Sequence, residues 1–185
     1  WADKIIISGS IRSTYEDFHW KPRLSQALQL ILKSNKPTYA ICFGAQFVAH
    51  ELGGKVKCNP QGTELGSVQI SLTEQGQKHP LLKGFHQNKK VHANHHDAIM
   101  KLPKGAVLLA YNDNSKVQAF QYKNIFASQF HPNLPINYLG ELFTFYKLSY
   151  LSRGILRDEY HFEQIIEDLP AGKSSYQILD RFLNQ

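Results

Sequence analysis

The chain has 185 residues, of which 42% are hydrophobic and 19% charged, values that are ordinary for a globular protein with one core. It has no run of eighteen apolar residues, which excludes a membrane-spanning helix, and its two cysteines are too few for a disulfide framework. The formal net charge of +6 is spread along the chain, with Lys89-Lys90 as the longest basic run, which favours a solvated basic surface over a nucleic-acid site.

The organisation of the chain predicts one domain over residues 1–185. No linker rich in Pro, Gly or Ser divides it, and no internal repeat is present. No signal peptide is visible and cysteine is scarce, so we expect a cytoplasmic, reducing location. Because residue 1 is Trp and the apolar run "KIIIS" follows almost at once, we expect the domain to be incomplete at its N-terminal side.

The first third of the chain predicts a strand, a helix and a second strand. Lys4 to Ile7 is an apolar run stopped by "SGS", which is typical of a strand buried on both faces of a parallel sheet. In "SQALQLILKS" the apolar residues fall at helical spacing, and "SNKP" ends that helix. The run "TYAI" then leads directly into Cys42.

Beyond Cys42 the pattern predicts another helix, then strands and hairpins, then helices again. The helix begins just past Cys42 and stops at Gly53-Gly54. The runs "SVQISL", "AVLLAY", "KVQAFQY" and "NIFASQFHP" read as strands, whereas "YLGELFTFYKLSYL" and two stripes after residue 161 have helical spacing. This order predicts an α/β fold of the doubly wound type, with a mostly parallel sheet flanked by helices and added antiparallel strands.

Cys42 lies at the end of one predicted strand and His131 at the end of another. A thiol at the start of a helix faces free backbone N–H groups that favour the thiolate, although most cysteines after apolar strands are small core residues. A lone His after a strand is more often a surface or capping residue. Together at one sheet edge, however, the two residues would form a nucleophile and base pair.

Several motifs carry a more specific resemblance. "ICFGAQ", "LGGKV", "ELGSVQI", "HPLLKGF", "ANHHDAIMKLPKGAVLLA" and "FASQFHPN" occur in the order and spacing of the class I glutamine amidotransferase domain. The match runs from about residue 4 to residue 133. It implies a flavodoxin-like, three-layer fold from which an N-terminal strand and helix are missing. The resemblance is greatest to the glutaminase part of GMP synthase and its free-standing relatives.

The resemblance implies a cysteine hydrolase that acts on the side-chain amide of glutamine without a cofactor. Cys42 would form a γ-glutamyl thioester, and His131 would carry the proton. The oxyanion would be held by the N–H of Phe43 and by the turn at Gly9 and Ser10. Further residues would hold the substrate; these are Gln46, His95 and His96.

Asn133 departs from the family pattern, in which a glutamate stands two residues after the histidine. An amide can orient the imidazole but carries no charge to stabilise an imidazolium. We therefore expect Asn133 to be the third member of the catalytic set, with activity that is weakened or differently tuned. Two alternatives stay open: a hydrolase or transferase of other γ-glutamyl compounds, and a family member with a binding or regulatory role.

The remaining expectations concern ligands and partners. "HANHHD" contains good zinc ligands, but the resemblance already accounts for it as a loop near the active site, so no metal site is expected. Cys58 is expected to be an incidental thiol. No synthetase domain fits after His131, so an ammonia acceptor would lie on a synthetase partner. The aromatic helix "YLGELFTFYKLSYL" is the candidate contact of a homo-oligomer, and no nucleic-acid or membrane partner is expected.

Overall fold

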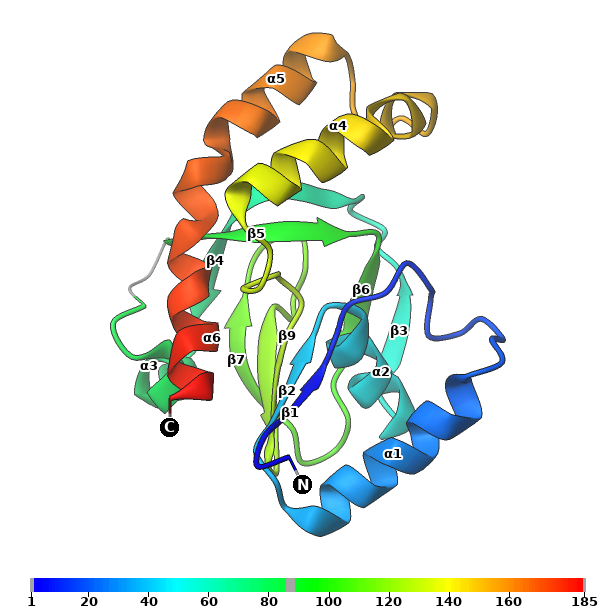
Figure 1. The fold of residues 1–185 in the computed structure, drawn as a ribbon, viewed down its shortest axis with the longest axis vertical. Coiled ribbons are helices and arrows are strands. Elements are labelled where there is room, and N and C mark those ends of the chain that lie inside the picture. The colour runs from blue at the N-terminus through cyan, green and yellow to red at the C-terminus, as the bar shows by residue number, and fades with distance from the viewer. Residues whose placement is uncertain (1, 86–88, 185) are drawn as a thin grey trace.

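A mixed β-sheet flanked by helices forms the centre of the molecule (Figure 1). The computed structural model describes residues 2–85 and 89–184. Its strands are β1 (Ile5–Ile7), β2 (Thr38–Ile41), β3 (Lys55–Cys58), β4 (Glu64–Leu72), β5 (Lys89–His95), β6 (Asp97–Lys101), β7 (Val107–Tyr111), β8 (Ala119–Tyr122) and β9 (Ile125–Ser128). Its helices are α1 (Lys21–Ser34), α2 (Phe43–Glu51), α3 (Glu74–Lys78), η1 (Pro80–Leu82), α4 (Ile136–Ser152), α5 (Glu159–Asp168), η2 (Leu169–Ser175) and α6 (Tyr176–Leu183).

The sheet has the order β1-β2-β9-β8-β7-β4-β5 among the described residues. Strands β1, β2 and β9 are parallel, and every further pairing in this sheet is antiparallel. Strands β3 and β6 form a separate antiparallel pair. The predicted α/β fold with added antiparallel strands is confirmed, while parallel pairing is confined to the three strands whose ends carry the candidate site.

Strand β1 differs from its prediction. It pairs with β2 on one side only in the described part of the chain, so it is an edge strand. Ile6 points to the opposite face of the sheet from Ile7 and is 45% exposed, whereas Ile7 is buried. The prediction of a strand buried on both faces is therefore wrong, because an apolar run does not reveal whether other elements cover each face of the strand.

Helices cover both faces of the sheet, which gives the three layers that the resemblance implied. Alternate residues of β2 point to opposite faces: Ala40 packs in a cluster with α1 and α2, while Tyr39 and Ile41 pack in a cluster with η1 and α6. The helix predicted to begin just past Cys42 is confirmed as α2. The buried side chains of α2 pack in the same cluster as Ala40 and α1, and so hold the end of β2 against the helices on that face of the sheet.

Helices α4 and α5 form a further cluster beside β4 and β5, and α5, η2 and α6 follow one another as a single column (Figure 1). Leu139, Phe143 and Tyr150 bury one stripe of α4 in this cluster. Phe145 and Leu148, on the other side of α4, are 80% and 79% exposed. One side of α4 thus packs in the core as expected, while the other side is exposed.

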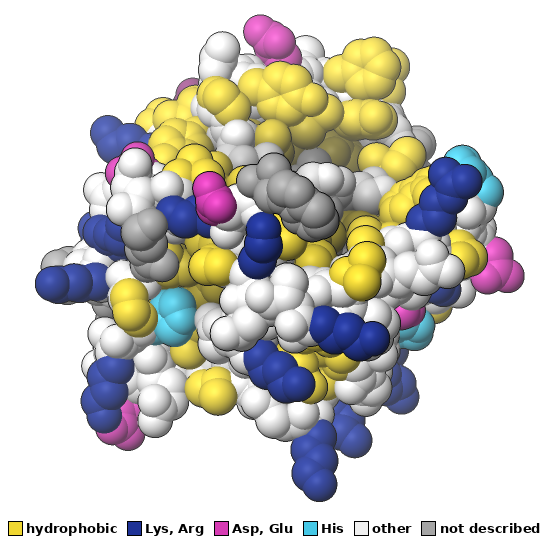
Figure 2. Space-filling view, turned by 60° about the horizontal axis from the view of Figure 1, so that its bottom comes forward, with side chains coloured by type: hydrophobic (Ala, Val, Ile, Leu, Met, Phe, Trp, Pro, Cys, Tyr) yellow, Lys and Arg dark blue, Asp and Glu magenta, His cyan; other side chains and the backbone are white. Residues whose placement is uncertain are grey.

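Lys and Arg side chains are scattered over the face drawn in Figure 2 and do not gather into one patch. In the described part of the chain, none of the helices combines the length and the apolar character that crossing a bilayer requires.

Candidate active site

Cys42 occupies a sharp turn between β2 and α2. Its backbone has φ 51° and ψ −107°, a conformation that is strained for a residue with a side chain. The N–H of Cys42 donates to the carbonyl of Ser128 at 2.8 Å, which ties the turn to the end of β9. A Cβ at Gly44 would lie 2.3 Å from the carbonyl oxygen of Ile7, so only glycine lets α2 start this close to β1.

Gly9, Cys42 and His131 meet at the carboxyl ends of the parallel strands. A Cβ built on Gly9 would lie 3.1 Å from Cε1 of His131 and 3.6 Å from Cβ of Cys42. The backbone of Gly9 therefore passes directly over both side chains. Ser10, the next residue, is exposed, and its Oγ accepts the N–H of Arg12 at 3.2 Å.

The thiol of Cys42 is 6% exposed and is surrounded by polar groups. It donates to the carbonyl of Asn94 at 3.9 Å and accepts from Nε2 of Gln129 at 3.8 Å. Burial raises the pKa of the Cys42 thiol to about 12, and the charge of Asp97 also raises this pKa, while the backbone N–H of Phe43 and the amide of Gln129 lower it. Cys42 is therefore a neutral thiol at neutral pH.

His131 is buried and uncharged. Its N–H donates to the carbonyl of His92 at 2.8 Å, which fixes its backbone to β5. Burial lowers the pKa of the imidazole to about 4, and the charges of His95 and His92 lower it further, while contacts with Asn133 and the backbone of Asn94 raise it. A neutral imidazole is the form that can accept a proton from Cys42.

Asn133 is exposed and close enough to the imidazole to raise the pKa of His131. The buried Nδ1 of His131 has no hydrogen-bond partner among the described residues, so Asn133 makes no bond to that atom. The position that the family pattern assigns to a carboxylate is therefore held by a weakly engaged amide. Among the described residues, no negative side chain is found to act on this ring and stabilise its protonated form.

Gln46 and Gln129 connect the thiol to strand β6. Nε2 of Gln46 donates to the carbonyl of Asp97 at 2.9 Å and to Oε1 of Gln129 at 3.2 Å. Both glutamines are buried. Gln129 lies in the quoted motif "FASQFHPN" but was not predicted as a site residue; its place two residues before His131 was the available signal, since such residues share a face of an extended chain.

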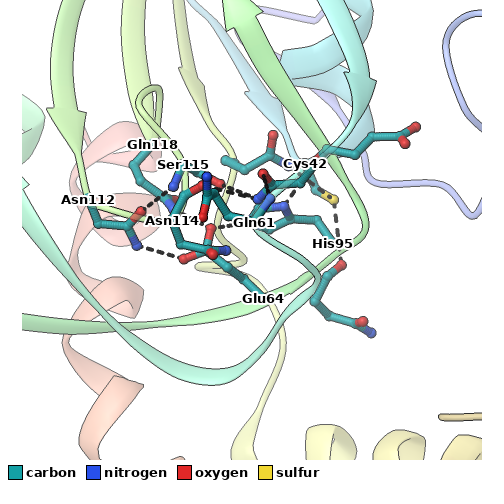
Figure 3. A network of polar contacts seen from close by, with 12 residues as sticks. Cys42, Gln61, Glu64, His95, Asn112, Asn114, Ser115 and Gln118 are labelled. Atoms are coloured by element: carbon teal, nitrogen blue, oxygen red, sulfur yellow. Dashed lines mark hydrogen bonds and ion pairs between the residues drawn. The ribbon is translucent and has the colours of Figure 1, made fainter. Parts of the chain in front are cut away.

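His95 and His96, which are adjacent in sequence, have opposite environments. His95 is buried and paired with Glu64, with 3.0 Å between Nε2 and Oε2. His96 is exposed, and its ring lies 3.2 Å from Sγ of Cys58 and 3.0 Å from Oγ1 of Thr63. Of these two predicted substrate-binding residues, the structure thus brings only His95 into the polar network of Cys42 (Figure 3).

The segment "HANHHD" contains residue types that can bind zinc, although no metal site was expected there. Within residues 2–85 and 89–184, no three His, Cys, Asp or Glu side chains converge in a way that could hold a metal ion.

Comparison with known proteins shows which family the chain is similar to. A family model described as glutamine amidotransferase class-I matches residues 1–147. GMP synthase [glutamine-hydrolyzing] of Phocaeicola vulgatus is 34% identical over 133 residues, which are 70% of this chain and 24% of that protein. Gamma-glutamyl peptidase 3 of Arabidopsis thaliana is 29% identical over 147 residues, or 76% of this chain and 58% of that protein.

A solved structure extends the likeness to the whole fold. A glutamine amidotransferase of Thermotoga maritima superposes with a TM-score of 0.84 at 22% identity and covers 98% of this chain and 76% of its own. At this identity the superposition shows a shared fold. The chain spans about a quarter of the length of the GMP synthase that it matches.

Proposed function

Because the chain belongs to the class I glutamine amidotransferase family, we propose that it is a cysteine hydrolase that cleaves the side-chain amide of glutamine and releases ammonia. One observation carries the proposal. Cys42 is held in a strained turn at the start of a helix, and the Cβ position of Gly9 lies within 4 Å of both Cβ of Cys42 and Cε1 of the neutral imidazole of His131. A nucleophile and a base at the same sheet edge are what thioester formation requires.

The proposed reaction begins with both groups uncharged. His131 accepts the thiol proton as the sulfur of Cys42 attacks the γ-carbonyl carbon, and a C–S bond forms. The protonated imidazole returns the proton to the amide nitrogen, so that ammonia leaves and the thioester remains. Water activated by His131 then cleaves the thioester to give glutamate and the free thiol.

The oxyanion formed in each step would be held by backbone N–H groups. The N–H of Phe43 already faces the sulfur closely enough to lower the pKa of Cys42. The second donor would come from the turn at Gly9 and Ser10, whose backbone crosses the site. Two such donors supply several kcal/mol of transition-state stabilisation in enzymes of this kind.

Gln46 would support the site indirectly, whereas the sequence suggested that it holds substrate. Its amide group is already engaged by the carbonyl of Asp97 and by Gln129. We propose that it orients Gln129 toward the thiol.

A second candidate substrate class is supported by the γ-glutamyl peptidase relative. Hydrolysis of a γ-glutamyl peptide uses the same attack on a γ-carbonyl and differs in the leaving group. Comparing kcat/KM for glutamine with kcat/KM for γ-glutamyl dipeptides separates the two classes. A preference of tenfold or more, which is about 1.4 kcal/mol, for the dipeptide would replace glutamine as the substrate.

The decisive experiment is covalent labelling with an electrophilic glutamine analogue, read by mass spectrometry. We expect one label on Cys42 and none on Cys58, which is exposed and serves as the internal control. Cys42→Ser should abolish the label, and glutamine should protect against it. If iodoacetamide modifies Cys42 while the analogue does not, the glutaminase proposal fails and a binding or regulatory role takes its place.

The protein that accepts the ammonia is the subject of a separate proposal. The relative from Phocaeicola vulgatus is a glutamine-hydrolysing GMP synthase, and this chain matches about a quarter of it. We propose a synthetase partner for this chain on that likeness. Mixing the protein with a candidate synthetase and measuring glutamine-dependent product formation tests it.

A further inference from the structure

Glu64 and His95 form a buried ion pair between strands β4 and β5. They are direct partners in the strand register, and their side chains are 4% and 1% exposed. Nδ1 of His95 faces the carbonyl of Asp97 at 3.0 Å, while Nε2 faces the Glu64 carboxylate at 3.0 Å. Because a carbonyl oxygen can only accept, Nδ1 of His95 donates to Asp97, and this bond turns Nε2 toward the carboxylate of Glu64.

The carboxylate of Glu64 is held by further donors. Nδ2 of Asn112 donates to Oε1 at 2.6 Å, and Nε2 of Gln118 donates to Oε2 at 2.7 Å. Burial acts to raise the pKa of Glu64, but the hydrogen bond and charge of His95, together with the hydrogen-bonding groups of Asn112 and Ser115, lower it to about 2. A charged pair buried in this way is costly to desolvate and is weak evidence for a purely stabilising role.

Asn94, which precedes His95, and Asp97, two residues after it, both contribute carbonyl groups to the environment of the thiol. The carbonyl of Asn94 accepts the Cys42 thiol at 3.9 Å. The carbonyl of Asp97 accepts Gln46, which in turn donates to Gln129, whose amide points at Sγ. Fixing the His95 ring therefore fixes the two carbonyl groups from which the polar surroundings of the thiol are built.

We infer that Glu64 is a positioning residue for Cys42: it fixes His95 and, through His95, the backbone of residues 94–97 that orients the nucleophile. The kinetic part of this inference rests on the proposed glutaminase function, whereas its effect on the thiol does not. The charge of His95 also acts on the base, since it helps to lower the pKa of His131. The titratable groups around the thiol are His131 after β9, His92 and His95 in β5, and Asp97 in β6.

The test compares Glu64→Gln with Asp168→Asn. Gln has the same shape as Glu but carries no charge. Its amide NH2 group would face one of the two donors, Asn112 or Gln118. Asp168→Asn breaks the Lys90 ion pair, 2.6 Å long, which binds the other end of β5 and lies half-exposed at the surface. Each variant is measured for its thermal midpoint, for the pH dependence of Cys42 alkylation by iodoacetamide, and for kcat/KM with glutamine.

We expect Glu64→Gln to lower kcat/KM by about 10-fold to 100-fold, because a small displacement of a reacting group has effects of this size. It should also move the pH midpoint of Cys42 alkylation, whereas Asp168→Asn should leave both readouts within about twofold of the wild type, as expected for a half-exposed ion pair. A pair with a merely structural role would lower the thermal midpoint alone. That result, with alkylation unchanged, would overturn the inference.

The experiment distinguishes failure of the proposed glutaminase function from failure of the positioning role. If the wild type does not hydrolyse glutamine, the proposed function fails, but a shift of alkylation in Glu64→Gln still supports the positioning role. If Glu64→Gln does not fold, Asn112→Ala removes one donor to the carboxylate and keeps the ion pair. A lower kcat/KM together with a moved pH midpoint of Cys42 alkylation in Asn112→Ala supports the inference. An unchanged alkylation midpoint contradicts it.

Discussion

At the scale of single residues, the site holds Cys42 and His131, the proposed nucleophile and base, in uncharged forms. Burial is the main cause for both, since it raises the pKa of Cys42 to about 12 and lowers the pKa of His131 to about 4. A protein with a carboxylate beside the histidine would instead favour the imidazolium. We therefore expect the identity of residue 133 to affect how readily His131 takes up the thiol proton.

Asn133→Glu is expected to raise the glutaminase rate by about tenfold or more, because a carboxylate would stabilise the imidazolium that forms during attack. It should also raise the pKa of His131. Since only neutral His131 accepts the thiol proton, the acid limb of kcat/KM should move upward from about pH 4. A pH–rate profile of both proteins is the measurement.

Asn133→Gln is the matched control, since it adds the methylene without the charge. If it matches the glutamate variant, side-chain length and not charge is responsible. An unchanged or lower rate in Asn133→Glu would indicate that Asn133 is adapted to another substrate or role.

Gly9→Ala is expected to lower kcat by about 10-fold to 100-fold with a small change in stability. The new Cβ would lie 3.1 Å from the His131 ring, so the ring must shift by a few tenths of an ångström. Stopped assays of ammonia release together with thermal melts check this. A large loss of the thermal midpoint would show that Gly9 serves the fold more than the site.

At the scale of elements, the junction of β1 and α2 places the nucleophile. Gly44→Ala should lower the free energy of unfolding by about 3 kcal/mol, because the Cβ would collide with the backbone of Ile7 and push α2 from the sheet. Denaturant unfolding measures the loss. Gly140→Ala in α4 is the control: nothing lies within 4 Å of its Cβ, and alanine favours helix by about 1 kcal/mol.

Antiparallel pairing brings the supporting network to this junction. Strands β4 and β5 lie at the far end of the sheet order from β1, yet the end of β5 returns to the thiol through Asn94. Helix propensity and strand alternation do not encode this return, because it depends on the curvature of the whole sheet.

At the scale of the whole molecule, the buried pair of Glu64 and His95 makes the free energy of unfolding depend on pH in the acid range. The pKa of Glu64 falls from an ordinary value of 4.5 to about 2 on folding, so its contribution is complete above about pH 4.5 and is lost as the pH falls toward 2. The difference in the free energy of unfolding between wild type and Glu64→Gln should therefore become smaller as the pH falls from about 4.5 toward 2. Urea unfolding at several pH values measures it, and a constant difference would contradict a charged pair.

The sequence by itself determined the α/β class, the helix that starts after Cys42, the family and the pairing of Cys42 with His131 as a hypothesis. These depend on local periodicity and on motifs whose residues are close along the chain. Only the tertiary structure decided that β1 is an edge strand, that His96 faces Cys58, and that Glu64, Asn94 and Gln129 belong to the surroundings of the thiol. Their partners are 31 to 87 residues away in sequence, from Glu64 with His95 to Gln129 with Cys42, and a hydrogen bond acts over about 3 Å of space, which no pattern along the chain records.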